Sequence, residues 1–190
     1  MNPYQKNPED RVAVILDLRN VSTPLRTFAG GKWVCYDALL DYVLDGRRLA
    51  TALVIDGVRP YADKADKDAS FHSYLSSCGY TSIRVPASNG ASKFECVDME
   101  VVYRMTRFAA DPRVDVIELI SGDGDYYNVI RNIRLDYNKQ VNVSSFRNNL
   151  AKAARKSAMA VTYLAEVPMI SMSPHRSGEE MVPMTPVKEE

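Results

Sequence analysis

The sequence has few of the residues that build sulfur- or imidazole-based sites. It contains three cysteines and two histidines in 190 residues. Cys35, Cys78 and Cys96 are scattered and form no CxxC pair, so they give no support for a zinc site or a redox motif. We interpret them as free thiols of a protein in a reducing compartment.

The chain also lacks a net charge and a long hydrophobic run. Lys plus Arg is 24 and Asp plus Glu is 24, so any evidence for a nucleic-acid partner has to be local. No apolar stretch approaches the roughly 18 residues needed to cross a bilayer. The polar N-terminus, "MNPYQKNPED", has no signal-peptide core. We expect a soluble, cytoplasmic protein with no membrane attachment.

What the sequence does contain is a regular alternation of strand-like and helix-like segments. The continuous apolar runs are typical of strands buried on both faces of a parallel sheet. Their alternation with helices predicts a doubly wound, mainly parallel sheet with helices on both faces, an α/β/α sandwich. The expected strands are 11–18, 50–58, 81–86, 114–121, 139–145 and, as a sixth candidate, 158–167; the expected helices are 33–46, 63–79, 97–111, 125–137 and 144–158.

These segments form one expected domain over residues 11–167, because 46% of the chain is hydrophobic and its length suits a single core. Residues 1–10 are expected to be an N-terminal extension. Residues 168–190 carry four prolines and little periodicity. We predict that this tail is disordered or is an extended arm that binds a protein partner.

Aspartates follow several of the predicted strands. Asp17 ends the first strand, and Asp123 and Asp125 follow the fourth in "SGDGDYY". Asp98 opens the helix after the third strand. In parallel sheets, ligands bind at the carboxyl ends of the strands, where the strand order reverses. If the first and fourth strands are neighbours, these four aspartates converge on one crevice.

Four carboxylates in one crevice repel one another unless a cation neutralises them. Oxygen ligands without histidine or cysteine favour Mg²⁺ or Mn²⁺. Such ions activate a water and stabilise a phosphoryl transition state, which is the chemistry of phosphodiester hydrolysis. The pattern therefore favours a metal-dependent hydrolase of phosphodiesters.

Each acid also has a simpler interpretation. Asp123 or Asp125 would serve as the N-cap of the next helix, and Asp98 as an acid in a first helical turn. Asp17 is harder to explain in this way, because an acid at the end of an apolar central strand is desolvated with no local structural benefit. The set as a whole favours the metal interpretation.

The motifs around these acids resemble a known family. The chain is similar to the NYN domain, the LabA/DUF88-like branch of the PIN-like nuclease superfamily, over roughly residues 11–167. The residues that carry the resemblance are Asp17 and Asn20 in "LDLRN", Val97 and Asp98 in "CVDMEVVYRM", and Ser121, Asp123, Asp125 and Tyr126 in "SGDGDYYNVI".

The resemblance implies a PIN-like fold and a metal-dependent endoribonuclease. It implies catalytic and metal-binding roles for the four aspartates, with Mg²⁺ or Mn²⁺ as cofactor. Asn20 and Ser121 would orient the ligands or contact phosphate. Arg19 and Glu95 stand where family members carry other residues. They leave open a second hypothesis, a weakly active or inactive RNA-binding or regulatory module that recruits a partner.

Basic residues supply the local evidence for RNA, single-stranded or structured, as the partner. Residues 144–163 include no acid, and with two arginines upstream they would form a basic rim for an RNA backbone. A solvated helix face is the alternative. The cations concerned are Arg131, Arg134, Arg147, Lys152, Arg155 and Lys156, with Arg147 and Lys152 as the expected substrate contacts.

Residues outside the group of four aspartates also have expected roles. Arg19 would contact a phosphate or neutralise the acids. Tyr126 and Tyr127 would stack on bases or pack in the core. His72 would have a surface or packing role. A haloacid-dehalogenase-type phosphohydrolase is disfavoured, because it needs a second Asp at the position of Arg19. A homodimer is left open.

Overall fold

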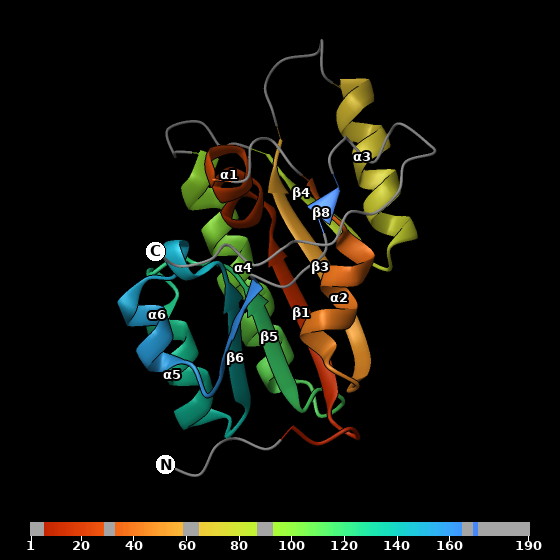
Figure 1. The fold of residues 1–190 in the computed structure, drawn as a ribbon. Helices are drawn as coiled ribbons and strands as arrows, with labels where there is room; N and C mark the ends of the chain where they lie inside the picture. The colour runs from red at the N-terminus through yellow and green to blue at the C-terminus, as the bar shows by residue number, and fades with distance from the viewer. Residues whose placement is uncertain (1–5, 29–32, 59–64, 87–92, 165–168, 171–190) are drawn as a thin grey trace, which may run out of the picture.

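The computed structural model describes residues 6–28, 33–58, 65–86, 93–164 and 169–170, and is built around a six-stranded sheet (Figure 1). The strand order is β4-β3-β1-β5-β6-β7, and each neighbouring pair is parallel. This confirms the predicted parallel sheet. The strands are β1 (Arg11–Asp17), β3 (Arg48–Gly57), β4 (Thr81–Val85), β5 (Val116–Ile120), β6 (Gln140–Ser145) and β7 (Val161–Tyr163).

Helices cover both faces of the sheet, as predicted. One face packs against α1, α2 and α3, and the other packs against α4 and α5. The central strands β1 and β5 are buried along almost their whole length, which explains their continuous apolar sequences. The helices are α1 (Leu18–Phe28), α2 (Tyr36–Leu44), α3 (Ala65–Ser77), α4 (Lys93–Ala110), α5 (Tyr127–Asp136) and α6 (Lys152–Ser157).

The first helix was missed by the sequence analysis. α1 begins directly after β1, although it contains Pro24. A proline inside a helix removes one backbone hydrogen bond and usually interrupts the helix. Here the apolar side chains of Leu18, Val21 and Leu25 recur at helical spacing and are buried against the sheet. Their burial outweighs the cost of the proline.

The predicted helix over 144–158 is wrong in its first half. β6 continues to Ser145, a 3₁₀ turn follows at η2 (Arg147–Asn149), and only α6 is α-helical. Ser144 and Ser145 stay in the strand because they pair with Thr162 and Tyr163 of β7. The predicted sixth strand is present but short.

A second, small sheet joins two distant parts of the chain. β2 (Trp33–Val34) pairs antiparallel with β8 (Met169–Ile170), so two residues of the expected tail are held in a strand. Residues 1–5 of the expected extension and 171–190 of the tail lie outside the described residues. Within the described part of the chain, no helix combines the length and apolar character required to span a bilayer.

Candidate functional site

The candidate site lies at the carboxyl ends of β1 and β5. β1 pairs with β3 on one side and with β5 on the other, so the strand order reverses here. Leu16 of β1 is in register with Ile120 of β5. The next residue of each strand, Asp17 and Ser121, therefore emerges side by side at the edge where parallel sheets bind ligands. The two strands are neighbours, which is the condition under which the sequence predicts that the aspartates converge.

Asp17 is a buried carboxylate surrounded by hydrogen-bond donors. Its side chain is 1% exposed. Oδ2 accepts hydrogen bonds from Asn20 Nδ2 at 2.6 Å, Ser121 Oγ at 3.2 Å and Tyr126 Oη at 3.2 Å. Oδ1 accepts only a long bond, 3.4 Å, from the Asn20 backbone amide. Burial raises the pKa of Asp17, and the hydrogen bonds from Asn20, Tyr126 and Ser121 act in the opposite direction.

Asp17 also has a local structural role that the sequence analysis denied. Because α1 begins at Leu18, Asp17 occupies the N-cap position of that helix. Its Oδ1 accepts from the amide of Asn20, the third helical residue, as N-cap carboxylates do. The expectation that Asp17 brings no local structural benefit is therefore wrong. A single bond of 3.4 Å still leaves the three donors around Oδ2 unexplained by capping.

Tyr126 connects Asp17 to Asp98. Its hydroxyl lies 3.2 Å from Asp17 Oδ2 and 2.9 Å from Asp98 Oδ1. A hydroxyl has one proton, so it donates fully to one carboxylate at a time. The two carboxylates therefore share this proton, and an additional proton or cation would stabilise the weaker contact. Burial raises the pKa of Tyr126, and the charges of Asp17 and Asp98 raise it further, which keeps the phenol protonated.

Asp98 experiences the charges of the remaining two acids. Burial is the largest cause that raises the pKa of Asp98, and the charges of Asp123 and Asp125 add to it. The hydrogen bond from Tyr126 and the charge of Arg19 lower this pKa. The four predicted aspartates thus lie at one end of the sheet. The Tyr126 hydroxyl joins Asp17 to Asp98, and the charges of Asp123 and Asp125 repel that of Asp98.

Asp123 and Asp125 lie in the loop between β5 and α5, and neither caps the helix. The N-cap of α5 is Tyr126, and it makes no side-chain capping bond. Asp123 Oδ1 instead accepts from the Asp125 amide at 3.0 Å, which forms a local Asx turn. The Asp123 amide donates to Ser121 Oγ at 3.2 Å. The capping interpretation therefore does not account for either acid.

The donor set suits a hard divalent cation. Within the described ranges, no three His, Cys, Asp or Glu side chains are grouped closely enough to hold one metal ion. The donors at this edge are nevertheless all oxygens, which Mg²⁺ and Mn²⁺ prefer. A second buried acid offers a contrast: Glu118 of β5 is paired with Arg47, Oε2 to Nη2 at 3.2 Å. Among the described residues, Asp17 has no such cationic partner.

Asn149 holds Asn20 in the orientation that serves Asp17. Pro24 has no backbone N–H, so the Asn20 carbonyl lacks its partner within α1. Asn149 Nδ2 donates to that carbonyl at 3.1 Å and contacts Asn20 Oδ1 at 3.4 Å. With its oxygen directed at Asn149, the Asn20 amide directs its nitrogen at Asp17. The helix-interrupting proline and the site are thereby connected.

Gly122 permits this contact by its lack of a side chain. A Cβ at Gly122 would lie 2.2 Å from the Asn149 carbonyl oxygen. The Ala151 amide also donates to the Gly122 carbonyl at 2.9 Å. Neither Gly122 nor Gly124 has a positive φ. Gly122 is therefore required for close packing of η2 against the site.

The predicted substrate-contacting residues Arg19, Arg147 and Lys152 are less closely connected to the aspartates than Asn20 and Ser121 are. Arg19 is exposed on α1, and its charge reaches Asp98. The Arg147 guanidinium lies 4.3 Å from the ring centre of Tyr163. Lys152 is exposed at the start of α6. Within the part of the chain that the structure describes, no hydrogen bond or ion pair connects Arg147 or Lys152 to the aspartates. The side chain of Glu95 lies outside the described residues.

Two residues that build the site were not identified from the sequence. Tyr126 belongs to the "SGDGDYYNVI" motif, but we expected its ring to pack in the core or to stack on bases. The sequence did not indicate that its hydroxyl connects two acids. Asn149 belongs to none of the sequence motifs, because its role depends on how η2 packs against the start of α1. His72 is buried and contacts Ser82 Oγ at 3.1 Å and Asp56 Oδ2 at 3.7 Å, away from the four aspartates. This agrees with the expected packing role.

We predict that Gly122→Ala destabilises the protein by about 1–3 kcal/mol, because the added methyl group overlaps the backbone of Asn149. Gly124→Ala is the matched control. Its Cβ would lie 3.1 Å from the Ala151 Cβ, a much milder contact. Urea unfolding of both variants measures the difference. Equal midpoints for the two variants would show that the approach of η2 is not tight.

We also predict that Tyr126→Phe lowers the unfolding free energy by about 1–3 kcal/mol, because buried Asp17 loses a donor. Tyr127→Phe is the control, because Tyr127 is exposed. Thermal unfolding without metal compares the two variants. A Tyr126→Phe variant as stable as Tyr127→Phe would mean that the hydroxyl does not support the acids.

Comparisons with known structures agree with the overall fold. The chain resembles a solved protein of unknown function from Vibrio parahaemolyticus, with 21% identity and a TM-score of 0.71, over 85% of this chain and 96% of that one. A likeness to Staphylococcus aureus homoserine dehydrogenase (12% identity, TM-score 0.32, 82% of this chain and 32% of that one) is too weak to carry an argument. No curated protein matches the chain.

The family comparison covers nearly the whole described fold. The model of the NYN domain matches residues 11–165, from the start of β1 to just beyond β7. This range includes the four aspartates, Asn20, Ser121 and Tyr126. NYN domains are grouped with the PIN-like nucleases. The chain belongs to the NYN domain family.

Proposed function

We propose that the protein is a metal-dependent ribonuclease that hydrolyses RNA phosphodiester bonds. One observation carries the proposal: buried Asp17 is joined through the Tyr126 hydroxyl to Asp98, at a strand end where Asp123 and Asp125 add further negative charge. Such a group of acids is stabilised by a divalent cation. The family assignment to PIN-like nucleases supports the same chemistry.

The four aspartates would hold one or two Mg²⁺ or Mn²⁺ ions. When bound, the metal would supply an activated water and stabilise charge on the phosphate. Asp17 would offer Oδ1, the oxygen with the fewest hydrogen bonds. Asn20 and Ser121 keep Oδ2 in place, so that the free lone pairs of Asp17 face one direction. Asp123 and Asp125, on a loop, would adjust to complete the coordination.

RNA, single-stranded or structured, is the proposed substrate. Arg19, whose charge reaches Asp98, would contact a phosphate next to the acids. Arg147 follows β6 and Lys152 opens α6, so both lie at the same edge of the sheet as the aspartates. We propose that they bind the backbone on either side of the cleaved bond.

A second candidate function is an RNA-binding module without cleavage. Two observations favour it: the described side chains do not form a three-ligand metal cluster, and Arg19 already compensates part of the charge at Asp98. Both hypotheses predict RNA binding, and only the first predicts metal-dependent cleavage.

A cleavage assay separates the two. Labelled single-stranded and structured RNA is incubated with the purified protein in Mn²⁺, Mg²⁺ or EDTA. We expect cleavage in Mn²⁺ or Mg²⁺ and none in EDTA. Asp123→Asn should lower the rate by about 100-fold or more, since loss of groups that only orient metal ligands costs roughly 10–100-fold.

The matched control is Asp136→Asn, an exposed aspartate in the last turn of α5. It removes the same charge and should cleave at the normal rate. Cleavage that persists in EDTA, or an equal loss in both variants, would contradict the metal site. Binding without cleavage in any metal would favour the second candidate.

A further inference from the structure

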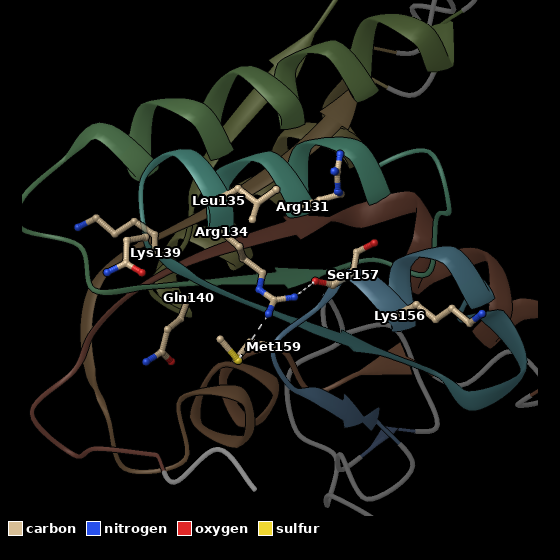
Figure 2. A pocket seen from close by; sticks show the side chains of 9 residues that line it. Arg131, Arg134, Leu135, Lys139, Gln140, Lys156, Ser157 and Met159 are labelled. Carbon is tan, nitrogen blue, oxygen red and sulfur yellow. Dashed lines mark hydrogen bonds between the residues drawn. The ribbon is translucent and has the colours of Figure 1, made fainter. Parts of the chain in front are cut away.

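A basic pocket lies at the opposite edge of the sheet from the aspartates. It has a volume of about 600 Å³ and lies between the end of α5, the start of β6 and the turn after α6 (Figure 2). Gln140 lines it, and this residue begins β6 in register with Val116, the first residue of β5. Because β6 rises about 3.3 Å per residue, the pocket is roughly 15–20 Å from the carboxyl edge. It is a separate site.

The charge of this pocket has one sign. Arg131, Arg134, Lys139 and Lys156 line it, and no acidic residue does. The chain as a whole has equal numbers of acids and bases, so this concentration of cations is local. Residues 137–163 contain no Asp or Glu at all. Such a surface attracts anions.

Two of the four cations build the wall. Arg134 donates to the Ser157 carbonyl and contacts Met159 Sδ at 3.9 Å, as Figure 2 shows. Lys139 donates to the carbonyls of Asp111 and Val114. Two polar atoms in this wall, Arg134 Nε and Gln140 Oε1, are buried with no hydrogen-bond partner among the described residues. The wall is therefore polar and charged.

The other two cations are available to a ligand. Arg131 and Lys156 are exposed, on α5 and α6 respectively. Neither forms an ion pair with a residue that the structure describes. Leu135, 66% exposed, and Met159, 44% exposed, add apolar surface beside them. Charged donors next to exposed apolar side chains suit a ligand that carries both phosphates and apolar groups.

The cations continue from the pocket toward the aspartates. α5 and α6 pack together, and each has one end at the carboxyl edge and one at the pocket. Lys152 opens α6 at the carboxyl edge, and Arg155 lies further along the same helix toward the pocket; both are exposed. The two edges are roughly 15–20 Å apart, so these cations extend over several residues of a polymer. A single-stranded nucleic acid, which carries one negative charge per nucleotide, fits such a line of cations better than an acidic peptide, because its regular charge continues as far as the carboxyl edge.

We propose that this pocket is a second RNA-binding site, which holds the phosphodiester backbone of a single strand that runs along α5 and α6 to the aspartates. The choice of RNA rests on the proposed function. The pocket anchors the strand at a distance from the cleaved bond through Arg131 and Lys156. Binding there needs no metal.

The salt dependence of binding tests the pocket. Binding of a labelled single-stranded RNA, long enough to cover both edges, is measured in EDTA over a range of salt concentrations. Each phosphate contact contributes about 0.7 to the slope of log affinity against log salt for a single strand. The double variant Arg131→Gln with Lys156→Gln should therefore lower the magnitude of this slope by about 1.4.

The control double variant is Lys6→Gln with Arg48→Gln. It removes two cations beside β3, which pair with Asp45 and Glu9, and so changes the net charge equally. Its slope should match that of the wild type. Equal slopes for the two double variants, or no RNA binding by the wild type, would overturn the proposal. So would a polyglutamate peptide that competes as well as RNA at equal charge.

The result is independent of cleavage. A lowered slope in the pocket variant together with no cleavage in any metal would keep the second RNA site and remove the ribonuclease. Metal-dependent cleavage with an unchanged slope would keep the ribonuclease and remove the pocket.

Discussion

The buried carboxylate of Asp17 is the constraint around which the carboxyl edge of the sheet is organised. It ends the central strand β1 with 1% exposure, in a setting where an ionised acid is costly. The protein balances the comparable acid Glu118 with Arg47. At Asp17 it supplies neutral donors instead, from Asn20, Ser121 and Tyr126. Neutral donors hold the group in place without balancing its charge.

Several unusual local features serve this arrangement. Pro24 frees the Asn20 carbonyl, Asn149 binds it, and Gly122 makes room for Asn149. None of these residues is one of the four aspartates, yet each helps to fix Asn20, which donates to Asp17. The acids themselves are held less firmly on the loop side, where Asp123 and Asp125 lie outside regular structure. Binding of a cation would therefore require movement of the loop more than of the strand.

Much of this fold could be predicted from the sequence, because continuous apolar strands and helical periodicity specify a parallel sheet with two covered faces. The position of Asp17 and Ser121 followed from the strand ends. α1 could not be predicted, because a proline such as Pro24 usually interrupts a helix. Here the burial of the apolar face of α1 against the sheet outweighs that effect. The bridge by Tyr126 and the contact of Asn149 depend on how distant segments meet, which no local pattern encodes. The metal-binding roles of the four aspartates remain predictions.

The proposed function requires that this edge of the sheet hold a divalent cation. The most direct measurement is a crystal structure of the protein with Mn²⁺, using anomalous scattering to locate the ion. We predict a peak within about 2.0–2.3 Å of an Asp17 carboxylate oxygen, close to the distance of Mg²⁺–oxygen contacts, with at least one of Asp98, Asp123 and Asp125 as a further ligand. A structure at saturating Mn²⁺ with no peak at Asp17, and with the Tyr126 bridge unchanged, would contradict it.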